Sequence, residues 1–181
     1  GPLHGIDVLI DAVALVHRRR PDANVHLELV GHCSTPEQLR DRARAAGISD
    51  RVHFRGPLPH DAVPDVLRTF TVFAAPSRME SFGVSILEAS ASGLPVVVSD
   101  TDGPAEVAVD GVTGFVVPRE DAPAAASAII RLIDDPELGA ALGVAGRGHV
   151  EQQYAWQASV DRLLAVYERA LASHGVGAAR P

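Results

Sequence analysis

The nine residues E-S-F-G-V-S-I-L-E at positions 80–88 decide the fold of this chain, because they place two glutamates, with seven residues between them, after one apolar run and before another. The run T-F-T-V-F-A-A-P-S at 69–77 precedes them, and A-S-A-S-G-L-P-V-V-V-S-D at 89–100 follows. Short apolar runs bounded by turn residues are typical of buried strands. The stretch therefore predicts a strand, a loop, a helix that begins near residue 84, and a second strand.

The loop before this helix is predicted to bind an anion. Backbone N–H groups near Phe82, Gly83 and Val84 would point out of the first helical turn, where the helix dipole favours negative charge, and Gly83 has no side chain to exclude a phosphate. Glu88 follows roughly 6 Å further along the helix, an offset that suits a carboxylate accepting two hydrogen bonds from a diol. Glu80 lies on the other side of the same anion. A diphosphate flanked by two hydroxyl-bearing groups is a nucleotide-sugar, and this is the predicted ligand.

The rest of the chain alternates between strand and helix patterns. Continuous runs rich in Val and Phe, which are typical of strands buried on both faces of a parallel sheet, occur at 25–31, 51–55, 70–75, 95–99 and 114–117. Helices are predicted at 6–19, 36–46, 61–68, 84–92, 121–134, 136–152 and 156–172. This order predicts one Rossmann-like, doubly wound α/β domain over residues 1–172, followed by a frayed tail at 173–181.

Two smaller predictions concern single positions. Asp102-Gly103-Pro104 has the composition of a turn. Trp156 and Tyr167 share a helix with apolar residues and are predicted to pack against the domain.

Several motifs together resemble one known family. E-x7-E after P-S is followed by E-A-x-A-x-G-x-P-V-V, and the motifs L-E-L-V-G (27–31), D-R-V-H-F-R-G (50–56), D-G-V-T-G-F-V-V-P (110–118) and Y-A-W…Y (154–167) occur in the same order as in that family. The chain is similar over about residues 3–172 to the C-terminal, donor-binding half of the retaining glycosyltransferases of family 4, which have the GT-B fold. Linked motifs in order are far more specific than E-x7-E alone.

This resemblance implies roles for the residues of the motif. Glu88 is expected to hold the ribose hydroxyls, and Glu80 to contact hydroxyls of the donor sugar as the catalytic carboxylate. The backbone of Ser81 and of Phe82–Val84 is expected to hold the diphosphate as it leaves. No metal and no further cofactor is expected, since fixed N–H dipoles stabilise the leaving diphosphate.

Other residues are placed in the donor site less directly. His4 stands where the family has a lysine, and is either a phosphate partner or a surface histidine. Gly31 and His32 follow one predicted strand, and Arg55 and Gly56 end another, at the edge where such sheets bind ligands. Arg78 is expected either to pair with phosphate or to form a local ion pair with Glu80.

The start of the chain departs from the family pattern. The family's C-terminal half opens with a strand and a turn bearing an Arg before the first helix, whereas this sequence opens close to the helix itself. In the strand order 3-2-1-4-5-6 that strand is central. The edges near Leu29 and Phe73 are therefore expected not to pair with each other. The N-terminal, acceptor-binding half is also expected to be missing, so that this fragment alone is inactive.

Composition restricts the remaining function classes. A net charge of −7 argues against binding nucleic acid. All sixteen Lys and Arg residues are Arg, which excludes a P-loop lysine and a pyridoxal Schiff base. The single Cys33 and the lack of a long apolar run indicate a cytoplasmic protein, with any peripheral membrane contact only through the missing half.

Two alternatives stay open, a non-catalytic nucleotide-sugar-binding module and another GT-B enzyme such as a sugar epimerase.

Overall fold

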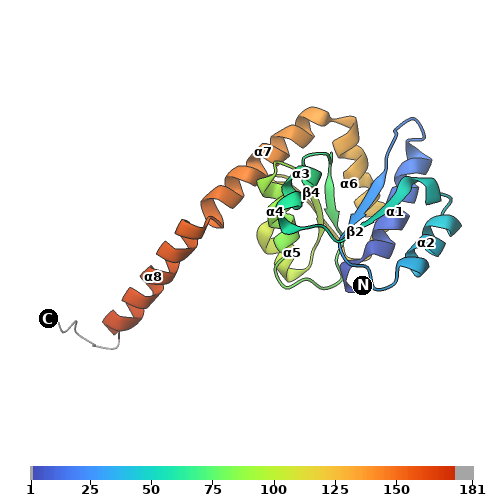
Figure 1. The fold of residues 1–181 in the computed structure, drawn as a ribbon. Helices are drawn as coiled ribbons and strands as arrows, with labels where there is room; N and C mark the ends of the chain where they lie inside the picture. Colours follow the sequence, from blue (N-terminus) through green and yellow to red (C-terminus); the bar gives the residue numbers. More distant parts are fainter. Residues whose placement is uncertain (1, 174–181) are drawn as a thin grey trace.

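The protein is described here by a computed structural model that covers residues 2–173, with strands in the interior and helices around them (Figure 1). Strands β1 (Leu27–Val30) and β2 (Val52–Gly56) form one parallel pair. Strands β3 (Phe73–Ala75), β4 (Val96–Ser99) and β5 (Gly114–Val117) form a second sheet in that order, again with parallel pairing. The predicted parallel α/β fold is confirmed.

Helices connect successive strands, as crossovers in a parallel sheet require. The α-helices are α1 (Ile6–Arg19), α2 (Pro36–Ala45), α3 (Val63–Leu67), α4 (Val84–Ala91), α5 (Asp102–Val107), α6 (Ala122–Asp134), α7 (Pro136–Gln153) and α8 (Trp156–Ser173). Three short 3-10 turns are η1 (Pro2–His4), η2 (Ser49–Arg51) and η3 (His60–Ala62).

The two faces of the sheets have separate cores, and β4 supplies both of them. Val97 packs in the core that includes α1, α2 and α6. Val96 and Val98 point the other way, into the core with α3, α4 and α5. Because successive side chains of a strand alternate between faces, a run of valines covered on both sides is the expected sequence of a central strand in a doubly wound sheet.

A gap separates β1 from β3. Within residues 2–173 these strands are not hydrogen-bonded to each other, and a cavity of about 1270 Å³ is lined by both of them, by Ile6 and by Leu9. The prediction that the edges near Leu29 and Phe73 do not pair with each other is confirmed. The core between the sheets therefore lacks a strand at the position where the doubly wound order has its central one.

The segment predicted as a turn at Asp102-Gly103-Pro104 begins helix α5 instead, so that prediction was wrong. Thr101 precedes the helix in an extended conformation, and its carbonyl accepts a hydrogen bond of 3.0 Å from the Ala105 N–H. Proline is tolerated in a first helical turn, where its missing N–H has no intrahelical acceptor. Gly and Pro side by side therefore do not distinguish a turn from a helix start.

Helix α8 continues from the end of α7 and extends away from the two sheets (Figure 1). Trp156 is 82% exposed and Tyr167 57% exposed, so the prediction that they pack against the domain was wrong for the described residues. The helix reaches Ser173, and residues 174–181 of the predicted tail lie outside the described part. Across residues 2–173, no helix combines the length and the apolarity that a membrane crossing requires.

Candidate functional site

The loops that leave the carboxyl ends of the strands lie at one edge of the sheets. The Gly31 N–H donates a hydrogen bond of 2.8 Å to the Gly56 carbonyl, which joins the loop after β1 to the end of β2. The Ser99 hydroxyl donates one of 2.5 Å to the Ser77 carbonyl, which joins the end of β4 to the loop after β3. The edge predicted from the sequence is thus formed as expected.

Helix α4 starts at this edge, directly after Gly83. Gly83 has a φ of 90°, a conformation that strongly favours glycine, and a Cβ there would lie only 2.7 Å from Ile86 Cδ1. In the first turn that follows, the Ile86 N–H donates a 2.9 Å hydrogen bond to the Gly83 carbonyl, whereas among the described residues the N–H groups of Val84 and Ser85 have no acceptor within the helix. The Phe82 N–H, in contrast, donates a long hydrogen bond of 3.4 Å to Glu80 Oε1. One of the three N–H groups predicted to hold the anion is therefore turned toward Glu80.

Both glutamates of the motif line the large cavity. The Glu88 side chain is 31% exposed, and its Oε1 lies 3.7 Å from Nδ1 of the exposed His60, beyond hydrogen-bond distance. Ser85, which lies between the two glutamates in the sequence, lines the same cavity. The carboxylate of Glu88 thus faces open space beside the N-terminus of α4, where a ligand hydroxyl has room to donate to it.

The structure brings four of the nine other predicted residues to the same cavity. The residues His4, Gly31, His32 and Arg55 line it, and Gly56 lines an adjoining cavity of about 280 Å³. The Arg55 guanidinium donates a 2.6 Å hydrogen bond to Glu28 on β1. Ser81, Phe82, Gly83 and Val84 are not among the residues that line either cavity.

The Phe82 ring packs behind the loop, against the Tyr154 ring at 5.8 Å in an edge-to-face arrangement. Tyr154 ends α7, and its hydroxyl donates to the Glu106 carbonyl at 3.2 Å. Burial raises the pKa of the Tyr154 hydroxyl, which keeps it protonated as a donor. Phe82 thus anchors the loop by its side chain.

Gly103 supports the same loop from α5, a role that the sequence did not reveal. A Cβ at Gly103 would lie 2.5 Å from Phe82 N, 2.6 Å from Ser81 C and 2.7 Å from Glu80 O. Only glycine lets the loop backbone approach the helix this closely.

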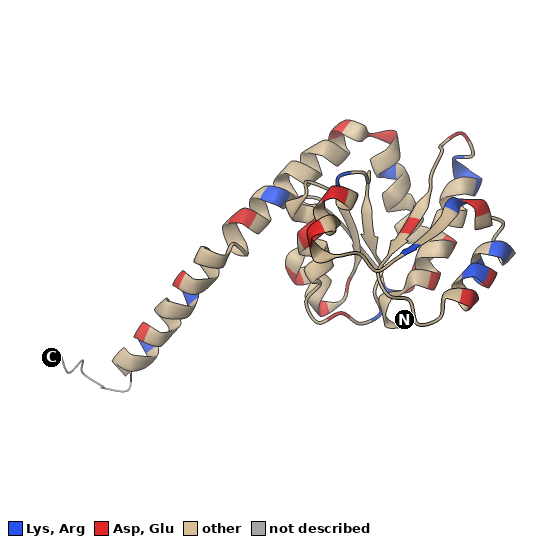
Figure 2. Ribbon diagram, viewed as in Figure 1, with Lys and Arg blue, Asp and Glu red and all other residues tan. Residues whose placement is uncertain are grey.

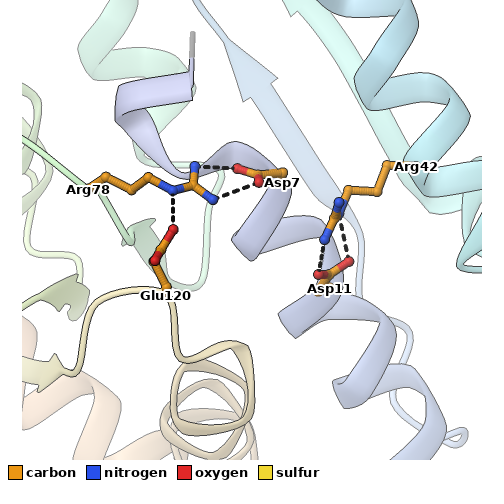
Figure 3. Close-up of polar contacts among 5 residues, drawn as sticks. All are labelled: Asp7, Asp11, Arg42, Arg78 and Glu120. Carbon is orange, nitrogen blue, oxygen red and sulfur yellow. Dashed lines mark hydrogen bonds and ion pairs between the residues drawn. The ribbon is translucent and has the colours of Figure 1, made fainter.

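Arg78 joins three segments next to Glu80 (Figure 3). Its two terminal nitrogens donate to the Asp7 carboxylate at 2.8 Å each, and its Nε donates to Glu120 at 2.5 Å. The hydrogen bonds from Arg78 lower the pKa of the Asp7 carboxyl. The expected local ion pair with Glu80 was wrong, because partners 71 and 42 residues away in the chain take the guanidinium instead.

Charges of both signs lie side by side on α2 and α8 (Figure 2). On α2, Arg40 pairs with Glu37 and Arg44 with Asp41, each at 2.6 Å. Within residues 2–173 no group of three or more His, Cys, Asp or Glu side chains is placed to hold a metal ion. Metal-independent binding stays a prediction.

Parallel strands with interleaved helices and a loop site at their carboxyl edge define the class of doubly wound α/β domains. The chain matches the model of the glycosyl transferases group 1 family over residues 2–135, and it belongs to this family.

Two curated relatives illustrate what the chain is similar to. It is 36% identical to a D-inositol 3-phosphate glycosyltransferase of Streptomyces avermitilis, over 96% of this chain and 39% of the relative. It is 37% identical to a GDP-mannose-dependent monoacylated alpha-(1-6)-phosphatidylinositol monomannoside mannosyltransferase of Corynebacterium glutamicum, over 90% of this chain and 43% of the relative. The chain thus spans about two fifths of the length of these relatives.

Solved structures agree with the fold. The sucrose-phosphate synthase of Thermosynechococcus elongatus superposes with a TM-score of 0.82 and 29% identity, over 96% of this chain and 44% of that one. Anabaena HepE in complex with UDP and glucose superposes with a TM-score of 0.81 and 26% identity, over 94% of this chain and 46% of that one.

Proposed function

We propose that this chain is the donor-binding part of a retaining glycosyltransferase, which transfers a sugar from a nucleoside diphosphate sugar to an acceptor bound elsewhere in the whole protein. The observation that carries the proposal is the position of Glu80 and Glu88, on either side of the α4 N-terminus, with both residues lining the cavity between β1 and β3. Membership of the glycosyl transferases group 1 supports sugar transfer. The complex of HepE with UDP and glucose supports a nucleotide-sugar as donor.

Each group at the edge has a separate task in this proposal. Glu88 accepts hydrogen bonds from the two ribose hydroxyls, because its carboxylate faces open space in the cavity. Glu80 contacts hydroxyls of the donor sugar from the opposite side of the anion. Its 3.4 Å bond with the Phe82 N–H is long and therefore weak, so that the ligand can displace it.

The chemical step needs stabilisation of the charge that develops on the leaving diphosphate. N–H groups of the first turn of α4 and the helix dipole supply fixed positive charge there, which requires no reorganisation during the reaction. The side chains at the edge include no obvious nucleophile. As the resemblance to retaining enzymes implies, we propose that the bond between the anomeric carbon and the diphosphate breaks while an acceptor hydroxyl attacks that carbon on the same face. The hydroxyl proton passes to the departing phosphate oxygen, and the anomeric configuration is retained without a metal ion.

Titration calorimetry on the protein in its full natural length tests this proposal with UDP and GDP as probes. Each charge-assisted hydrogen bond contributes about 1.5–3 kcal/mol, so Glu88→Gln should lower the affinity for the nucleotide by roughly tenfold or more. Glu168→Gln removes the same charge from the exposed surface of α8 and should leave the affinity unchanged. Equal affinity in Glu88→Gln and wild type, or loss of binding with chelator, would contradict the assignment.

A second candidate is a non-catalytic nucleotide-sugar-binding module, which the presence of His4 where the family has a lysine favours. Binding of UDP or GDP that depends on Glu88, with no release of sugar from UDP-glucose or GDP-mannose, would support this second candidate. Under the proposed enzyme, Glu80→Gln reduces turnover more than it reduces affinity for the bare nucleotide.

A further inference from the structure

The Arg78 side chain connects the loop that carries Glu80 to two segments that are distant in the sequence. Arg78 lies two residues before Glu80, and its guanidinium bonds to Asp7 in the first turn of α1 and to Glu120 in the loop before α6 (Figure 3). The side chains of Arg78 and Asp7 are only 29% and 30% exposed. A two-bond pair shielded to this extent has a defined geometry, unlike a flexible surface ion pair.

Backbone contacts hold the same loop against the start of the chain. The Arg78 N–H donates a 2.8 Å hydrogen bond to the Leu3 carbonyl, and the Met79 N–H donates one of 3.3 Å to the same oxygen. A Cβ at Gly5 would lie 1.9 Å from the Pro76 carbonyl oxygen, so the two segments touch there as well. The loop after β3 and the segment before α1 therefore form one unit, with His4 on one part and Glu80 on the other.

We propose that Arg78 is a positioning residue, which with Asp7 and Glu120 sets the distance between Glu80 and the start of α1 at the donor site. This inference rests on the proposed function. In this inference Arg78 is not a phosphate ligand: three of its five N–H groups donate to Asp7 and Glu120, and these two carboxylates compensate its charge. Its effect on the donor passes through Glu80.

The chain contains a matched control for this pair. Arg42 of α2 bonds to both oxygens of Asp11, which lies one turn further along α1 than Asp7 (Figure 3). Their side chains are 45% and 37% exposed, somewhat more than those of the first pair. Arg42→Gln thus removes an Arg–Asp pair from the same helix without touching the loop that carries Glu80.

Hydrogen exchange and calorimetry on the protein in its full natural length test the inference. Arg78→Gln and Asp7→Asn should both speed amide exchange in residues 78–83 by about tenfold, whereas Arg42→Gln should not. The affinity of Arg78→Gln and of Asp7→Asn for UDP or GDP should stay within about twofold of the wild-type affinity. The sugar of UDP-glucose or GDP-mannose should add affinity over the bare nucleotide in the wild type. In both variants this added affinity, or the turnover, should be about tenfold lower, because small displacements of a contact group have large effects.

Two further variants separate positioning from direct binding. The double variant Asp7→Asn/Arg78→Gln should be no worse than Arg78→Gln alone, because Arg78→Gln already removes the contact with Asp7. Arg78→Lys should restore only part of the effect, since an ammonium cannot reproduce the planar guanidinium contacts. A phosphate ligand would behave differently: Arg78→Gln would weaken bare UDP or GDP by tenfold or so while Asp7→Asn would not. That result would overturn the inference.

The outcomes also separate this inference from the proposed function. If the wild type binds neither UDP nor GDP, or Glu88→Gln binds like the wild type, the proposed function fails while the exchange measurement still reports on the loop. If Glu88 matters but Arg78→Gln matches Arg42→Gln in exchange and affinity, positioning by Arg78 is refuted and the proposed function stands.

Discussion

Replacing Gly103 by alanine is the sharpest test of how closely the Glu80 loop is held. The new Cβ would lie 2.5–2.7 Å from backbone atoms of residues 80–82, whereas real Cβ atoms essentially never come within 3.0 Å of another group. The loop must therefore move by at least 0.3–0.5 Å, the difference between 3.0 Å and these distances. Backbone atoms cannot turn aside as a flexible side chain can.

The expected loss follows from two opposing effects. Overpacking of this kind costs about 1–3 kcal/mol. Alanine offsets up to roughly 1 kcal/mol of this in a helix. With the full offset, Gly103→Ala should lower the free energy of unfolding by about 0–2 kcal/mol. It should also weaken the binding of a nucleotide-sugar by about tenfold, since the displaced residues include Glu80.

Gly148→Ala provides the control for this change. Gly148 is also in a helix, α7, and a Cβ there would meet no atom within 4 Å. The variant should be more stable than wild type by about 0.5–1 kcal/mol and bind nucleotide-sugar normally. Urea unfolding and calorimetry with UDP-glucose or GDP-mannose measure both quantities. A Gly103→Ala variant that behaves like Gly148→Ala would refute the close contact.

Three further predictions concern other contacts. Asp7→Asn should matter less for stability as the pH falls, because the bond from Arg78 lowers the pKa of Asp7 in the folded state. The Asp7 carboxylate therefore contributes its full stabilisation above about pH 5 and loses it as the pH drops below about 4. Urea midpoints of wild type and variant at several pH values measure this difference. Gly143→Ala should destabilise the fold by about 1–3 kcal/mol, because its Cβ would lie 2.0 Å from the Gly93 carbonyl oxygen. The folded variant should bind nucleotide with unchanged affinity. Altered affinity would count against separate roles for α7 and the site. Tyr154→Phe should cost about 1 kcal/mol in thermal or urea unfolding, since it removes one hydrogen bond but keeps the ring; no loss would argue against that bond.

The fold was largely predictable because its strands carry a clear signal. Val96–Ser99 is buried throughout, and a continuous run of β-branched residues is what a strand covered on both faces requires. The unpaired edges of β1 and β3 were also predictable, since strand order in doubly wound sheets follows from few rules. Helix α5 was missed because Gly103 and Pro104 suit a turn and a first helical turn equally well.

The site was predictable only where its chemistry is local in the sequence. The placement of Glu80 and Glu88 around the start of α4 was predictable because one loop and one helix carry both of them, and their roles stay predictions. The partners of Arg78 were missed, because which of many carboxylates meets a guanidinium depends on tertiary packing that no spacing records. The exposed face of α8 was missed for a related reason: apolar residues at helical spacing do not say against what they pack.

The central claim is that Glu88 holds the ribose hydroxyls of a bound nucleoside diphosphate, and a cycle of variant and ligand tests it most directly. Calorimetry compares UDP or GDP, whichever the wild type binds, with its 2′,3′-dideoxy analogue in wild type and in Glu88→Gln. Removal of the hydroxyls should weaken binding to the wild type by about 1.5–3 kcal/mol or more and have little effect on Glu88→Gln. An equal loss in both proteins would show that the hydroxyls bind elsewhere and would contradict the assignment.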